Sequence, residues 1–243
     1  DNLIEVTQTG TVTGAVSGAN TDYTAPGVTI TVPNVICTIA DNDAAGFTLS
    51  PSTTASSRQN TSEPGVTANL TVRLTSQPAS GKTVTVRLRS NDVSEGQLST
   101  TAIVRTSTST TGGTDTINFA GSTDLSAVAI GDRVWITGIG SNSDLQGNVL
   151  SVIDAADTIV LSANLLTESG AETITIYPRL ALTFTNATWA TLQTVTVTGQ
   201  DDLVTDTALQ QNYQIDFEID TAAATHDANY IAGLAPTQWM KNL

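Results

Sequence analysis

Apolar and polar residues alternate one by one along several short segments of this chain. Residues 68–74 and 213–219 carry apolar side chains at every second position, and residues 84–88 repeat the pattern. Because successive side chains of a β-strand point to opposite faces, this alternation places the apolar side chains on one face of each strand. Turn-forming clusters such as Pro64-Gly65 and Ser90-Asn91-Asp92 separate the segments. The pattern predicts an all-β fold of half-buried antiparallel strands, typical of a β-sandwich, with very little helix.

A change in composition marks an insertion within this sandwich. Residues 106–113 contain only Thr, Ser and Gly, which is typical of a low-complexity linker. Short apolar segments with tight turns follow it, at residues 130–138, 147–152, 157–161 and 173–176. We therefore predict an inserted small β-barrel or β-roll at residues 106–178, and a sandwich made of residues 44–105 plus 179–243.

The two ends of the chain resemble each other at a spacing of about 200 residues, and self-similarity of this kind is typical of tandem repeats. Asp1-Asn2-Leu3-Ile4-Glu5 resembles Asp201-Asp202-Leu203-Val204-Thr205, and residues 20–27 resemble residues 227–233. Residues 1–43 are therefore interpreted as the closing strands of a preceding repeat, or as a donor-strand segment for a neighbour.

The second copy of this pattern lacks a counterpart of the strand expected at Val28–Ile39. A sandwich without its last strand leaves unpaired backbone groups and an open apolar groove. One expectation is that residues 1–40 of a neighbour fill the groove by strand addition, giving head-to-tail assembly of identical subunits or neighbouring repeats. The other is a self-contained chain with a shortened sandwich.

Five motifs follow one another along the chain outside the insertion. They are Ala40-Asp41-Asn42-Asp43-Ala44-Ala45-Gly46-Phe47, Thr61–Gly65, Leu70–Leu74, Ser90–Gly96 and the run from Leu182 to Asp202. In this order they resemble the Calx-β-like repeat of large bacterial cell-surface proteins. The resemblance covers residues 40–105 and 180–235, with residues 1–43 as a partial further copy. It implies an immunoglobulin-like β-sandwich for the main part of the chain.

The same resemblance implies calcium at one end of the sandwich. The ligands that it carries over are Glu63, Asp92, Asp201, Asp202 and Asp206, with Asp41 and Asp43 at the junction that closes the preceding unit. Calcium takes six to eight oxygen ligands, and a cation lowers the repulsion between clustered carboxylates. The alternative is that these acids cap turns, as Asp and Asn often do.

Charge and cysteine content limit the partners. The formal net charge is −14, and a surface this acidic repels phosphate backbones, which excludes nucleic acid as a partner. The chain has no apolar run approaching the roughly 18 residues of a membrane-spanning helix, so we expect no membrane insertion. Cys37 is the single cysteine and cannot form a disulfide within the chain. We expect it to be a buried small hydrophobe.

Catalytic motifs are missing from the sequence. His226 is the one histidine, in a predicted loop, and no nucleophile elbow, P-loop, dinucleotide fingerprint or zinc-binding helix motif occurs. We predict that the protein is not an enzyme.

The sequence therefore predicts a structural unit of an extracellular bacterial cell-surface array, such as a stalk, adhesin or filament, stiffened by calcium. One alternative is a ligand-binding adhesin module whose inserted barrel contacts a glycan or a host protein. A further alternative is a phage fibre domain.

Overall fold

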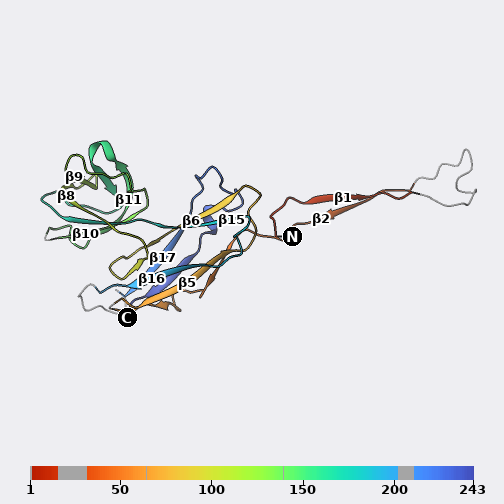
Figure 1. The fold of residues 1–243 in the computed structure, drawn as a ribbon, viewed down its shortest axis with the longest axis horizontal. Helices are drawn as coiled ribbons and strands as arrows, with labels where there is room; N and C mark the ends of the chain where they lie inside the picture. The colour runs from red at the N-terminus through yellow and green to blue at the C-terminus, as the bar shows by residue number, and fades with distance from the viewer. Residues whose placement is uncertain (1, 16–31, 64, 139, 202–210) are drawn as a thin grey trace, which may run out of the picture.

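The computed structural model describes residues 2–15, 32–63, 65–138, 140–201 and 211–243. The only helical segments in these ranges are the three-residue 3-10 turns Asp154–Ala156 and Ala232–Leu234, which confirms the predicted all-β fold. The strands form a two-sheet sandwich, a closed barrel and a separate hairpin (Figure 1). Among the described residues, no helix has the length and apolar content that a membrane span requires.

Two sheets make up the sandwich. The larger sheet contains, in spatial order, β15 (Leu180–Thr185), β6 (Thr83–Ser90), β17 (Asn212–Ile219), β18 (Thr237–Lys241) and β4 (Gln59–Asn60). The smaller sheet contains β3 (Phe47–Ser50), β5 (Thr67–Leu74), β16 (Gln193–Gly199) and β7 (Gly96–Leu98). Strands from both sides of the insertion lie in both sheets, so the sandwich depends on the two chain segments together.

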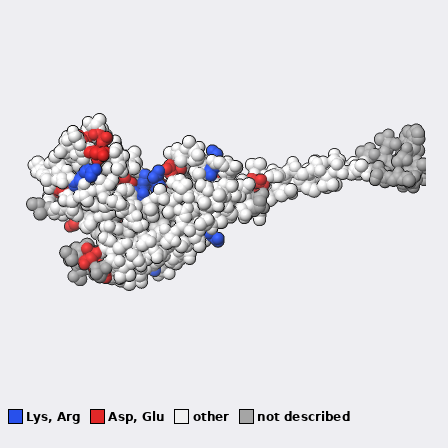
Figure 2. Space-filling model, in the orientation of Figure 1, with Lys and Arg blue, Asp and Glu red and all other residues white. Residues whose placement is uncertain are grey.

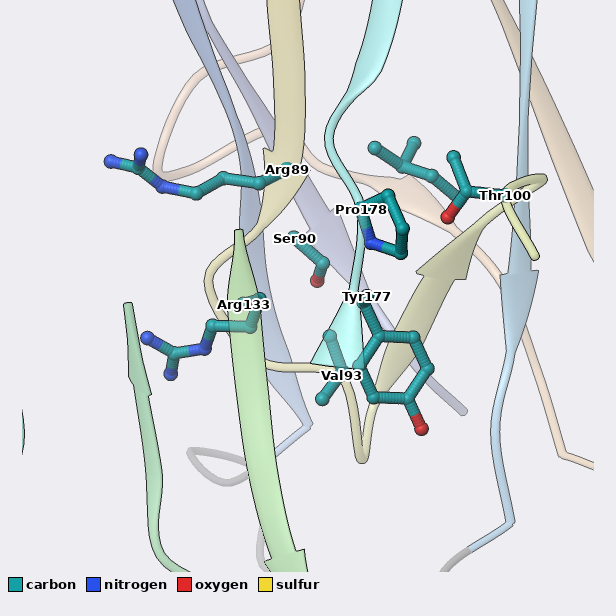
Figure 3. A pocket seen from close by; sticks show the side chains of 8 residues that line it. Arg89, Ser90, Val93, Thr100, Arg133, Tyr177 and Pro178 are labelled. Atoms are coloured by element: carbon teal, nitrogen blue, oxygen red, sulfur yellow. The ribbon is translucent and has the colours of Figure 1, made fainter. Parts of the chain in front are cut away.

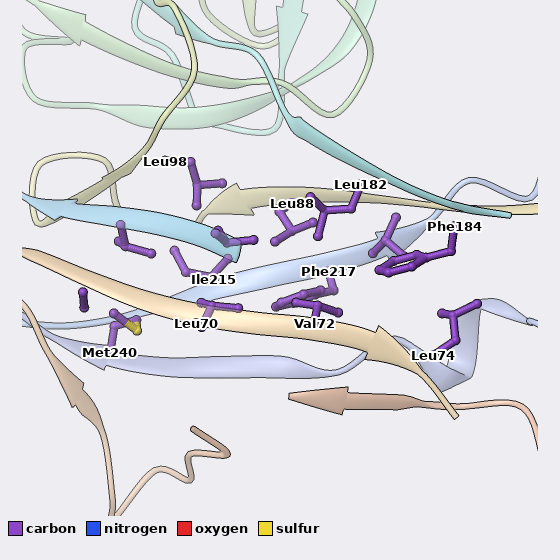
Figure 4. Packing of buried hydrophobic residues seen from close by; sticks show 14 of the residues in the cluster. Leu70, Val72, Leu74, Leu88, Leu98, Leu182, Phe184, Ile215, Phe217 and Met240 are labelled. Atoms are coloured by element: carbon purple, nitrogen blue, oxygen red, sulfur yellow. The ribbon is translucent and has the colours of Figure 1, made fainter. Parts of the chain in front are cut away.

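The sandwich core comes from the alternating positions of these strands. In β5 and β6 every second residue is buried, and the same holds for β17. Leu70, Leu88, Phe184 and Ile215 are fully buried between the two sheets (Figure 4). Burying a side chain of this size stabilises the fold by about 1.5–3 kcal/mol, so the alternating apolar positions contribute strongly to the sandwich's stability.

The inserted region closes into a barrel with its own core. Six strands form the ring in the order β8 (Ile103–Thr111), β14 (Thr173–Tyr177), β10 (Arg133–Thr137), β11 (Gln146–Ile153), β12 (Thr158–Leu161) and β9 (Thr116–Phe119). Pairing of β9 with β8 completes the ring, and the short β13 (Glu168–Ser169) adds to β8. Val134, Ile136, Ile159 and Ile174 are fully buried inside it. The predicted inserted β-barrel is therefore present.

The segment expected to be a linker at residues 106–113 is mostly strand. Residues 106–111 belong to β8, and only the two glycines that follow lie in a turn. Threonine is β-branched and suits a pleated strand. Ser107 and Thr110 are buried there. Hydrogen bonds make this burial tolerable, because the Thr110 hydroxyl donates to the Leu166 carbonyl at 2.7 Å and the Ser107 hydroxyl accepts from the backbone N–H of Glu172 at 3.0 Å. Low complexity concealed a strand that closes the barrel by pairing with β9 and whose buried hydroxyls are hydrogen-bonded.

The expectation that the C-terminal sandwich lacks its final strand is wrong. Strand β18 pairs antiparallel with β17 along five residue pairs and lies between β17 and β4. Its pattern is hidden in the sequence because one of its two buried residues is Gln238, whose amide donates to Oε1 of Gln59 at 3.0 Å. Part of the expected donor strand, residues 28–31, lies outside the described residues.

The barrel and the sandwich meet at a polar junction. Gln146 of the barrel donates from Nε2 to Oδ1 of Asp92 at 2.8 Å, and the Gln97 amide donates to the hydroxyl of Tyr177 at 3.1 Å. Val93, Tyr177 and Pro178 lie close together in this junction, with Arg133 on the barrel side (Figure 3). Lys and Arg side chains gather between the two bodies in Figure 2. The barrel is thus held against the sandwich by side chains as well as by the chain itself.

Candidate functional site

The N-terminal hairpin extends away from the sandwich (Figure 1). It consists of β1 (Gln8–Val12) and β2 (Val35–Ile39), which pair antiparallel over five residue pairs. Its base is attached through Gln77, whose backbone N–H donates to the carbonyl of Asn2 at 2.7 Å. The strands carry no charged residue, and the visible face of the hairpin is uncharged except near its base (Figure 2).

One face of this hairpin is apolar and exposed. Directly paired residues share a face, and the pairs on this face are Val12 with Val35, Gly10 with Cys37 and Gln8 with Ile39. The exposed fractions of Val12, Val35 and Ile39 are 60%, 57% and 61%. Cys37 is also exposed, so the expectation of a buried cysteine is wrong, because no described part of the chain covers this face.

The hairpin β17–β18, which closes the sandwich, has the same register. Gly10 pairs with Cys37, and Tyr213, which is 203 residues after Gly10, pairs with Met240, which is 203 residues after Cys37. The same shift relates the neighbouring pair of Val12 and Val35 to the pair of Ile215 and Gln238. The two ladders therefore correspond pair by pair. The face of β1–β2 that carries Gly10 and Cys37 corresponds to the face of β17–β18 that carries Tyr213 and Met240.

In β17–β18 the corresponding face is buried. Tyr213, Ile215 and Met240 are 2%, 0% and 0% exposed and belong to the sandwich core. The Tyr213 hydroxyl lies 2.8 Å from the hydroxyl of Thr61, and its ring contacts Gly96 of the opposite sheet. The hairpin β17–β18 is thus covered by the second sheet of the sandwich, whereas no described residue covers the corresponding face of β1–β2.

The predicted calcium ligands Asp41 and Asp43 lie at the base of the exposed hairpin. The Asp41 carboxylate accepts hydrogen bonds from the backbone N–H of Asp43 at 3.0 Å and of Glu5 at 2.8 Å. These hydrogen bonds, with that from Asp43 the stronger influence, lower the pKa of Asp41. This is the geometry of a turn cap, which was the alternative interpretation for the acids.

Two of the other predicted ligands lie at one end of the sandwich. Glu63 donates its backbone N–H to the carbonyl of Leu243 at 3.1 Å, and Asn242 donates to the carbonyl of Gln200, beside Asp201, at 2.7 Å. These contacts bring the segments of Glu63 and Asp201 together near the C-terminus. Asp202 and Asp206 lie outside the described residues.

Asp92 is engaged in hydrogen bonds at the same end. Its Oδ1 accepts from the backbone N–H and the hydroxyl of Ser94, at 3.1 and 2.6 Å, and from Gln146 of the barrel. Asp41 and Asp43 are at the opposite end, because the full length of β5, about 27 Å at the usual strand rise, separates Glu63 from the residues that contact the hairpin base. Within the described ranges no three His, Cys, Asp or Glu side chains form a metal-binding group.

Sequence reasoning missed an acidic pair in the barrel. Glu168 of β13 and Glu172, just before β14, approach each other beside Gly140. The only signal in the sequence was two glutamates four residues apart between two predicted strands, which does not show that either is buried.

Comparisons with known proteins add no relative. No protein-family model, no curated protein and no solved structure matches this chain. The arguments below therefore rest on the residues and their geometry.

Proposed function

We propose that this chain is a structural unit of an extended array, in which the β1–β2 hairpin closes the sandwich of a neighbouring unit. The observation that carries the proposal is the shared register of the two hairpins, combined with an apolar face that is exposed in one and buried in the other. An isolated two-stranded hairpin is at best marginally stable in water, so covering its apolar face stabilises it.

The neighbouring unit must be a sandwich that has no strands of its own at the position equivalent to β17–β18. In this chain β17 and β18 already occupy that position, between β6 and β4. A complete copy therefore offers no vacancy, whereas a unit made of strands equivalent to β3–β16 does. Each hairpin in such an array closes the preceding sandwich and connects it to the next, so the contacts run head to tail and leave the array open-ended.

The surroundings of the array are proposed from composition and from the resemblance described above. An acidic, Thr-rich chain with a single cysteine suits the bacterial cell surface, and the Calx-β-like motifs suit an immunoglobulin-like stalk, adhesin or filament unit. Calcium near Glu63 and Asp201 is the part of the proposal that rests on the resemblance. The experiment for it is calorimetric titration of the full chain with calcium, where E63Q with D201N should remove binding at that end.

A fusion protein tests whether the β1–β2 hairpin can close a sandwich that lacks β17 and β18. A fusion places a second copy of residues 44–200 directly before Asp1, so that β1–β2 follows it as β17–β18 follows these residues in the natural chain. We expect the Cys37 thiol to react with a disulfide reagent at the rate of an exposed thiol in the original chain and at least about tenfold more slowly in the fusion, which corresponds to about 1.4 kcal/mol of protection.

Two substitutions make the test specific. V12K places a charge on the apolar face and should restore rapid labelling in the fusion, while T11K, on the opposite face, should not. G10Y introduces the ring that Tyr213 supplies in the closed sandwich, and a side chain at Gly10 meets open space in the original chain. G10Y should therefore raise the melting temperature of the fusion only. Equal labelling rates for the fusion and the original chain, with and without G10Y, would contradict the proposal.

A further inference from the structure

Glu172 is a buried acid whose carboxylate accepts no hydrogen bond from a donor group among the described residues. The residue is 5% exposed, and the polar group that its side chain meets is the carboxylate of Glu168. Its backbone is fixed on β8, because the N–H donates to the hydroxyl of Ser107 at 3.0 Å and the carbonyl accepts from the Ser107 N–H at 3.0 Å. A carboxylate in this position loses its hydration and gains no hydrogen bond from a donor group in return, which is costly.

Glu168 points its carboxylate at the same place. Its Oε1 accepts from the backbone N–H of Ser141 at 2.5 Å, and its Oε2 accepts from the Asn142 amide at 3.3 Å. A Cβ built on Gly140 would collide with Oε2 of Glu168 and with Oε1 of Glu172. The two carboxylates therefore converge on one point beside Gly140, and a cavity that is lined by Gly140 and residues 167–172 opens to solvent next to this point.

The charge of this pair is not balanced by the protein. The ion pairs of the described residues involve only the basic residues Arg87, Arg89 and Arg179, all at the junction with the sandwich or within it. Burial, followed by the neighbouring Glu168, raises the pKa of Glu172 to about 7. Hydrogen bonds from Ser141 lower the pKa of Glu168. Two carboxylates that converge on one point, one of them buried without a donor group, require either a proton or a cation between them.

We propose that Glu168 and Glu172 bind a calcium ion at this mouth of the barrel. Both side-chain ligands are carboxylates, which hard cations prefer, and the chain's single cysteine and single histidine lie outside the barrel, so a softer metal has no ligand there. Calcium accepts the irregular geometry and the additional waters that a shallow, open cavity provides, whereas magnesium demands a near-ideal octahedron. The ion would fasten the segment of β13 and β14 to the turn at residues 140–142.

The test uses the full chain with calcium alone as the probe. Without divalent cations, E172Q should melt at a higher temperature than the original chain, because an amide replaces a buried charge. With calcium about 100-fold above its dissociation constant, the barrel transition of the original chain should rise by roughly 10–20 °C. E172Q and E168Q should each abolish this rise and the corresponding heat of binding. D144N, an exposed acid in the neighbouring turn, should leave both unchanged.

Three outcomes would overturn the site. They are no response of the original chain to millimolar calcium, a response that survives E172Q, and stabilisation by acid alone with none by calcium, which would show that the pair shares only a proton. This site is independent of the proposed array. E63Q with D201N tests calcium at the sandwich end, and the labelling of Cys37 tests the hairpin, so failure of one leaves the others standing.

Discussion

Nη1 of Arg179 donates to Oε2 of Glu218 at 3.0 Å, although Arg179 follows the last barrel strand and Glu218 lies in β17 of the sandwich. The same arginine donates its backbone N–H to Oδ1 of Asp132, a barrel carboxylate that is 3% exposed, at 3.1 Å. Burial raises the pKa of Asp132, and hydrogen bonds from the backbone N–H of Ala129 and Arg179 oppose this shift. Arg179 thus connects a buried acid of the barrel with an exposed acid of the sandwich.

Replacing Arg179 with Met should lower the free energy of unfolding by about 2 kcal/mol, because Asp132 remains buried without its nearest cation. E218Q removes only the exposed partner, which is 52% exposed, and should cost less than about 1 kcal/mol. Denaturant unfolding of both variants measures the difference. Equal losses would show that Arg179 acts through Glu218 alone.

Removing the barrel should leave a folded sandwich. The barrel strands run from Ile103 to Tyr177 and enclose a core separate from that of the sandwich. A short Gly-Ser connection from Ala102 to Pro178 should therefore preserve cooperative unfolding, since loop closure over a few residues costs little. Circular dichroism during heating measures this. Loss of any cooperative transition would show that the barrel is required for the sandwich core.

A methyl group at Gly96 should be destabilising. A Cβ there meets the ring of Tyr213, which is buried and bonded to Thr61. G96A should cost about 1–3 kcal/mol through forced movement of the ring. The control variant G10A adds the same methyl group on the exposed face of the β1–β2 hairpin, where it meets open space. It should change the free energy of unfolding by less than about 0.5 kcal/mol. A neutral G96A in urea unfolding would contradict the packing described for Tyr213.

Without divalent cations, stability should fall as the pH rises. The pKa of Glu172 increases from its ordinary 4.5 to about 7 on folding. The folded state therefore binds a proton more tightly than the unfolded state, and this contribution is complete below pH 4.5 and disappears as the pH passes about 7. Melting temperatures between pH 5 and 8 in a chelator should show this slope for the original chain and a flatter one for E172Q. Identical slopes would exclude Glu172 as its source.

Part of this architecture was predictable from local patterns. The alternation in residues 68–74 and 213–219 located β5 and β17 and their buried faces, since the period of a strand is independent of its partners. The barrel followed from short apolar segments in the same way. Strand β18 was missed because Gln238 is buried, and β8 was missed in part because a run of Thr and Ser reads as a linker. In both strands a buried polar side chain donates a hydrogen bond to a distant residue, Gln238 to Gln59 and Thr110 to Leu166, and no local pattern contains that partner.

The candidate sites also depend partly on sequence and partly on tertiary structure. The sequence by itself determined that the chain is all-β and acidic, because these properties depend on residue type and spacing. Only the tertiary structure decided that Cys37 is exposed, that β1–β2 has the register of β17–β18, and that Glu168 and Glu172 meet at Gly140. Burial and convergence are relations between segments far apart in the chain. They arise from how strands pair and sheets close, which residue spacing alone does not specify.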